Sequence, residues 1–113
     1  MKGLAERSCV PCKGGVPPLD AAEIAPLLAQ LDGWKVVDKH HLEKCYSLDD
    51  FAQALQLVNR IGAIAEEQGH HPDLLLAWGR VEVKIWTHKV GGLTESDFIL
   101  AAKCDAAYAT ETR

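Results

Sequence analysis

The sequence lacks any long apolar run and any cluster of basic residues. No stretch approaches the ~20 apolar residues needed to cross a bilayer, and residues 1–7 lack the apolar core of a signal peptide. The 12 Lys and Arg residues are scattered and the formal net charge is −4, so we expect no binding to nucleic-acid phosphates. These absences predict a soluble cytoplasmic protein with neither a membrane nor a nucleic-acid partner.

Aromatic residues are also few, at 6% of the chain, yet the overall balance is that of a globular protein. Hydrophobic residues make up 48% and charged residues 25% of the 113 positions. A chain of this length has a large surface relative to its interior. We therefore expect a single domain that gains stability by associating with copies of itself.

Cysteine is limited to four residues, and nothing in the sequence indicates secretion. Cys45 and Cys104 lie in apparently regular elements and are expected to be buried core thiols. Cys9 and Cys12 form a C-x-x-C pair, which has the spacing of half a zinc site or of a redox pair, but a second ligand pair at similar spacing is not visible. We expect residues 1–18, rich in Gly, Pro and Cys, to be a flexible leader before one domain at 19–113.

Three helix starts share one pattern, in which a capping residue is followed three positions later by an acidic residue. The pairs are Asp20 with Glu23, Ser47 with Asp50, and Thr94 with Asp97. Pro26 should kink or shorten the first helix. The second helix is long and must end close to His71, because the residue before Pro72 disfavours helical geometry. The third helix should reach about residue 108.

Two pairs of strands lie between these helices, at residues 34–38 with 41–46 and at 74–78 with 80–88. The connecting turns are too short for a parallel crossover, so the strands must be antiparallel. Along 80–88, Val81, Val83 and Ile85 alternate with residues that face away from the core. The predicted fold is α+β in the order α-β-β-α-β-β-α, with one four-stranded antiparallel sheet and three helices packed on one face.

Histidines supply the strongest candidates for chemistry. Glu66 and His70 are four apart on the last turn of the predicted central helix, so the carboxylate can orient or charge the imidazole. His71 follows directly, and Pro72 then forces the chain to turn at a helix-to-strand junction, where concave sites commonly form. The adjacent pair of histidines at 40 and 41 is expected to lie in a solvated turn, and Trp86 is interpreted as an interface aromatic.

The run Glu66-Glu67-Gln68-Gly69-His70-His71-Pro72 is followed by Trp78, Thr87-His88, Gly92-Leu93 and Asp97. This pattern closely resembles the pterin-4a-carbinolamine dehydratases over residues 19–107. The resemblance implies an enzyme that converts 4a-hydroxytetrahydropterin to quinonoid dihydropterin and water by histidine general acid/base catalysis, in tetrahydrobiopterin recycling. It implies no cofactor and no metal, because no electrons leave the substrate, and it implies a homodimer or homotetramer.

The same resemblance assigns roles to individual residues. The catalytic set is His70, His71 and His88, with His71 the first choice for the principal acid or base. Glu66 and Asp97 would support the histidines, although helix capping explains Asp97 equally well. The substrate-binding positions implied are Pro72, Thr87, Lys89, Val90 and Trp78.

Two other classes of function remain open from the sequence. The family fold can act as a protein-binding, dimerisation module, in which case the histidines would carry no chemistry. The chain could also be a metalloprotein that uses Cys9, Cys12 and the histidines, although adjacent histidines fit one tetrahedral ion poorly.

Overall fold

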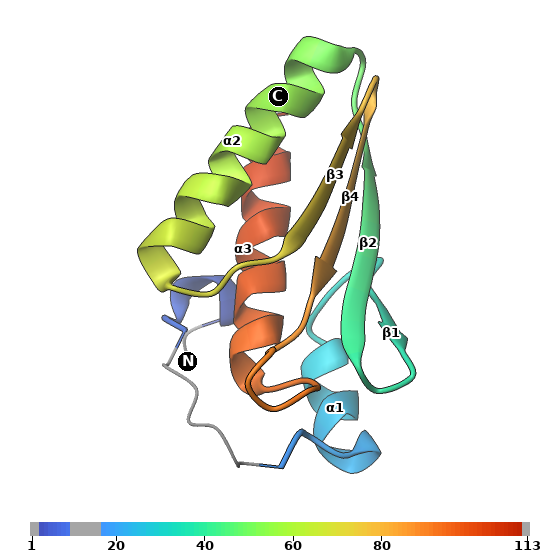
Figure 1. Cartoon of the computed structure of the whole chain (residues 1–113), viewed down its shortest axis with the longest axis vertical. Helices are drawn as coiled ribbons and strands as arrows, with labels where there is room; N and C mark the ends of the chain where they lie inside the picture. Colours follow the sequence, from blue (N-terminus) through green and yellow to red (C-terminus); the bar gives the residue numbers. More distant parts are fainter. Residues whose placement is uncertain (1–2, 10–16, 112–113) are drawn as a thin grey trace.

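The computed structural model describes residues 3–9 and 17–111 of the chain. A short 3-10 helix, η1 (Leu4–Glu6), precedes helices and strands in the order that the sequence predicts. The helices and strands are α1 (Ala21–Leu28), β1 (Lys35–Val37), β2 (His41–Ser47), α2 (Phe51–Gln68), β3 (Asp73–Ala77), β4 (Arg80–Ile85) and α3 (Glu95–Glu111). The predicted α+β fold class and element order are confirmed (Figure 1).

The four strands form one sheet in the order β1-β2-β4-β3, and every neighbouring pair is antiparallel. Along β4, Val81, Val83 and Ile85 are fully buried while Lys84 is exposed, as the alternation predicts. Helices α2 and α3 contact the central strands and supply most of the apolar layer over this buried face. No helix in the described part of the chain is long and apolar enough to cross a membrane.

The cap of the first helix is confirmed, but that of the second is not the predicted one. Asp20 and Glu23 form a reciprocal capping box at the start of α1. At α2, the Asp50 side chain accepts the Gln53 N–H at 2.9 Å, whereas Ser47 is the last residue of β2 and pairs with Arg80. The ladder with β4 therefore extends through the residue predicted as the cap, and the helix begins three residues later than that pattern indicates.

Two further boundaries differ in ways that affect the site. Helix α2 ends at Gln68, because Gly69 adopts the left-handed conformation (φ 65°) that closes many helices. Strand β4 ends at Ile85 rather than continuing to His88. Thr87 instead forms an isolated antiparallel bridge with Gly92. Both histidine segments thus lie in loops at an element's end.

Residues 3–9 pack against the domain. Leu4 is 4% exposed and belongs to the hydrophobic core, and η1 contacts α3. The sequence prediction began the folded unit at residue 19, because a Gly- and Pro-rich segment carries no periodic pattern by which to detect one buried leucine. Residues 10–16 of the predicted leader, including Cys12, lie outside the described residues.

A carboxylate on α3 ties this helix to the sheet. Asp105 accepts hydrogen bonds from Tyr46 Oη (2.5 Å) and Lys44 Nζ (2.9 Å), both on β2. It also accepts one from the Trp34 indole at 3.1 Å. Burial, and then the hydrogen bond to Asp105, raises the pKa of Tyr46, which keeps the phenol protonated as a donor.

We expect Asp105→Ala to lower the free energy of unfolding by about 1–3 kcal/mol, because it leaves partly buried donors without an acceptor. Urea denaturation followed by circular dichroism measures this change. Asp32→Ala is the matched control, because Asp32 is exposed and accepts the Lys44 Nζ bond through its backbone carbonyl. Equal stabilities for the two variants would contradict the proposed importance of the Asp105 contacts.

Candidate active site

All five histidines of the chain lie at one end of the sheet. Leu42, the second residue of β2, pairs with Ile85, the last residue of β4, and β3 starts with Asp73 opposite Lys84. The β1–β2 turn, the lead-in to β3 and the loop after β4 therefore lie at the same end of the sheet, its lower end in Figure 1. His40 lies in the β1–β2 turn and His41 begins β2. The lead-in to β3 carries His70 and His71, and the loop after β4 carries His88.

Asp97, in the first turn of α3, is a fully buried carboxylate that connects three segments of the chain. One oxygen, Oδ1, bonds His70 Nε2 at 2.5 Å. The other, Oδ2, accepts the Thr87 hydroxyl at 2.9 Å and the Thr94 backbone N–H at 2.8 Å. Capping and histidine fixing were alternative interpretations of this residue, and both contacts occur. A buried carboxylate is costly unless it is paired and hydrogen-bonded, and these three bonds meet that requirement. The bond to Nε2 also constrains the orientation of the His70 ring.

The predicted pairing of Glu66 with His70 is wrong. Glu66 Oε2 instead contacts His71 Nε2, and His70 turns inward to Asp97. The cause is Gly69, whose left-handed backbone ends the helix one residue before His70, so the four-residue helical spacing no longer applies. The His71 side chain is 57% exposed and that of Glu66 is 77% exposed, whereas the His70 side chain is only 11% exposed.

His88 lies in the loop after β4, exposed to solvent, with its ring edge-on to Trp86 at a centroid distance of 4.5 Å. The rings of His40 and His41 also lie near Trp86, at centroid distances of 5.2 and 6.0 Å. Their Nδ1 atoms are 3.1 Å apart. Both are half-buried, so the predicted solvated turn is wrong. The sequence does contain a signal for this contact. If the predicted hairpin at 34–46 pairs with the predicted strand at 80–88, the turn at His40 and His41 lies beside Trp86 and His88.

The predicted substrate-binding residues divide into two groups. Four of them lie at the histidine end of the sheet. Pro72 directly precedes β3, and Thr87, which is 3% exposed, donates its hydroxyl to Asp97. Lys89 and Val90 follow His88 in the turn after β4. Trp78 lies in the β3–β4 turn at the opposite end and is 73% exposed. The structure therefore does not bring Trp78 to the histidines of its own chain.

The cysteines are placed differently from one another. Cys104 is fully buried, as expected, whereas Cys45 is exposed, so its predicted core position is wrong. Cys45 alternates with buried Tyr46 on β2 and consequently points away from the helices. Cys9 is half-buried beside α3. Within residues 3–9 and 17–111, no three His, Cys, Asp or Glu side chains are grouped to hold a metal ion.

We expect native Cys45 to react with iodoacetamide at least ~100-fold faster than native Cys104. The thiolate is the reactive form, and burial raises the pKa of the Cys104 thiol, which lowers its thiolate fraction at neutral pH. Peptide mass mapping after timed labelling measures the two rates, and labelling in denaturant is the control in which they converge. Comparable native rates would contradict the placement of Cys104 in the core.

An antiparallel sheet covered by helices, with imidazoles and a buried carboxylate gathered at one end, defines an α+β protein with a histidine-rich candidate site. The chain belongs to the pterin 4 alpha carbinolamine dehydratase family, whose model matches residues 17–107. The family resemblance seen in the sequence is thereby confirmed.

Relatives in two bacteria cover nearly the whole chain. A protein of Rubrobacter xylanophilus, provisionally named a pterin-4-alpha-carbinolamine dehydratase, is 57% identical over 105 residues, which are 93% of this chain and 98% of the relative. A protein of Alkaliphilus metalliredigens with the same provisional name is 50% identical over 93% of this chain and 96% of its own length.

A solved structure supports the same assignment. The transcriptional coactivator/pterin dehydratase from Brucella melitensis is 33% identical, with a TM-score of 0.76 over 80% of this chain and 97% of that one. A pterin dehydratase-like protein described as a RuBisCO assembly factor in the alpha-carboxysome has a TM-score of 0.59 over 67% of this chain and 89% of its own. At 23% identity, that second likeness concerns the fold alone.

Proposed function

We propose that this protein catalyses the loss of water from 4a-hydroxytetrahydropterin to give quinonoid dihydropterin, with histidines as general acid and base. The observation that carries the proposal is the buried Asp97, which holds His70 at the sheet end where His71 and His88 also lie. Family membership supplies the substrate class. Histidine suits the chemistry because its ordinary pKa lies near neutrality, so it can either donate or accept a proton.

The reaction needs two proton transfers. The bond between C4a and the hydroxyl oxygen breaks as that oxygen receives a proton and leaves as water, and the neighbouring ring nitrogen N5 loses its proton as the C4a–N5 double bond forms. No electrons leave the substrate, so the atoms balance without an oxidant. In this proposal His71, the more exposed of the adjacent pair, is the principal proton carrier.

His70 takes a more restricted part. Its Nε2 is engaged by Asp97, so Nδ1 is the ring nitrogen that can face a ligand. His88 would bind the substrate and exchange protons from the loop after β4. Lys89, Val90 and Pro72 would contact the substrate at the same end of the sheet.

We further propose that the reaction serves tetrahydrobiopterin recycling in the cytoplasm, after an aromatic amino acid hydroxylase has released the hydroxylated pterin.

We also propose a homodimer or homotetramer, because exposed apolar side chains lie on the edge strand β3 and on α2. The large ones more than 40% exposed are Phe51 and Leu55 on α2 and Leu75 on β3, and Trp78 in the adjoining β3–β4 turn is also exposed.

A dehydration assay tests the proposal. The substrate is generated freshly by a pterin-dependent hydroxylase, and its conversion is followed by ultraviolet absorbance with and without this protein. A rate that rises in proportion to protein concentration is expected. A folded protein that leaves the spontaneous rate unchanged would instead favour a binding module, the role that the word coactivator in the Brucella relative's name suggests.

A further inference from the structure

Residues 3–9, here called the N-terminal strap, cross the end of α2 and the beginning of α3 (Figure 1). Leu4 is buried and anchors the strap in the core. Lys103 Nζ on α3 donates to the Ala5 carbonyl at 2.8 Å. Arg7 pairs with Glu95, the first residue of α3, at 2.5 Å. The strap is therefore attached along α3 at three successive points.

Cys9, at the far end of the strap, contacts both helices. Its backbone N–H donates to Gln68 Oε1 at 2.8 Å, and Gln68 is the last residue of α2. Its thiol lies 3.5 Å from the Ser96 carbonyl oxygen, in the first turn of α3. A single residue of the strap thus bridges the two helix ends.

These two ends carry the central contact of the candidate site. His70 follows Gln68 by two residues, across left-handed Gly69, and Asp97 follows Ser96 directly. The bond between His70 Nε2 and Asp97 Oδ1 is thus formed by side chains immediately beyond the two residues that Cys9 bridges. Because His70 lies outside the helix, its position depends on how the end of α2 is held.

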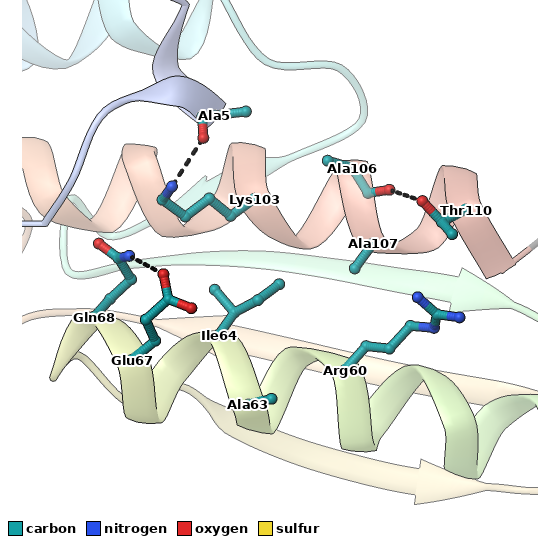
Figure 2. Close-up of a pocket in the computed structure, with 10 residues that line it drawn as sticks. All are labelled: Ala5, Arg60, Ala63, Ile64, Glu67, Gln68, Lys103, Ala106, Ala107 and Thr110. Carbon is teal, nitrogen blue, oxygen red and sulfur yellow. Dashed lines mark hydrogen bonds between the residues drawn. The ribbon is translucent and has the colours of Figure 1, made fainter.

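The helices leave space between them beside this point. A groove of about 420 Å³ runs between α2 and α3, and its lining includes Ala5, Gln68 and Lys103. Figure 2 shows the Lys103 ammonium reaching Ala5 of the strap, above the Gln68 side chain on α2. Direct packing of one helix on the other is therefore reduced at this end, and the strap supplies a polar connection there.

We propose that the N-terminal strap is a positioning device for His70. Through Cys9 it holds the end of α2 at the separation from α3 that the His70–Asp97 bond requires. Gln68 and Cys9 are positioning residues and do not contact the substrate. The effect on turnover rests on the proposed dehydratase function, whereas the effect on the His70 ring does not.

The test replaces Gln68 with methionine, which keeps the side-chain length but removes the acceptor. We expect faster solvent exchange of the His70 ring N–H, measured by NMR on ¹⁵N-labelled protein, and a kcat about three- to tenfold lower with little change in KM. Gln68→Glu retains an acceptor oxygen and should restore both properties. Gln56→Met is the matched control, because Gln56 is exposed on the same helix.

Three results would overturn the proposal: a wild-type His70 signal in Gln68→Met, a loss equal to that of Gln56→Met, or no recovery in Gln68→Glu. If Gln68→Met does not fold, Cys9→Ala serves instead. It removes the thiol contact to Ser96 and should speed exchange of the same ring N–H. An altered His70 signal in a protein without dehydratase activity would refute the proposed function and leave the strap's role standing.

Discussion

Replacing His71 with alanine is expected to lower kcat for dehydration by about 10²- to 10⁴-fold, the usual contribution of one general acid or base. The His71 side chain is 57% exposed, and it contacts the still more exposed Glu66. Its loss should therefore leave the fold intact, because exposed ion pairs contribute little to stability. The measurement is the initial rate of dehydration, together with the midpoint of thermal unfolding for the same preparation.

Two comparisons make this result specific. Free imidazole should restore part of the lost rate, because an exposed position admits the small molecule in place of the side chain. Glu66→Gln should lower kcat only a few-fold, and Glu67→Gln, a neighbouring exposed carboxylate on α2, should leave it unchanged. A His71→Ala protein with kcat within threefold of the wild type would remove His71 from the proposed mechanism.

Replacing Asp97 with alanine is expected to reduce both stability and activity. The substitution leaves His70, the Thr87 hydroxyl and the Thr94 N–H without their shared acceptor in a fully buried position. Breaking one side of a buried, paired charge costs about 3–5 kcal/mol. Urea denaturation measures the free energy of unfolding. We expect kcat to fall at least ~100-fold, because the His70 ring loses the group that orients it.

Two variants separate the charge of Asp97 from its shape. Asp97→Asn keeps one acceptor oxygen and the side-chain volume, so we expect a smaller loss of stability than in Asp97→Ala. The loss of activity should remain large, because the negative charge beside His70 is gone. Asp49→Ala, at an exposed position before α2, is the control and should change neither property measurably. If Asp97→Ala were as stable as Asp49→Ala, the buried network would not contribute as described.

The predictions that the structure confirms rest on local patterns. The alternation of Val81, Val83 and Ile85 identifies β4 and its buried face, because successive residues of a strand point to opposite sides. The capping box at Asp20 and the start of α3 near Thr94 follow from side chains that bond backbone groups three residues away. Such contacts depend on neighbours in the sequence and can be recognised there.

The predictions that failed concern side-chain partners or the ends of helices and strands, which residues nearby in the sequence do not decide. Helical spacing pairs Glu66 with His70 only if the helix is unbroken, but Gly69 ends α2 first. The capping pattern predicts Ser47 as a cap, although its backbone belongs to the ladder with Arg80. The common burial of cysteines predicts a core position for Cys45, but the register of β2 turns it outward.

By itself, the sequence determined the order of helices and strands, the family, and the residue types available for proton transfer. Only the tertiary structure decided which histidine turns inward to Asp97, 27 positions away in the chain, and which stays exposed. It also placed His40 and His41 beside Trp86 and the strap across two helix ends. Local periodicity specifies the face of each element, whereas side-chain partners at a site depend on how separate elements pack together.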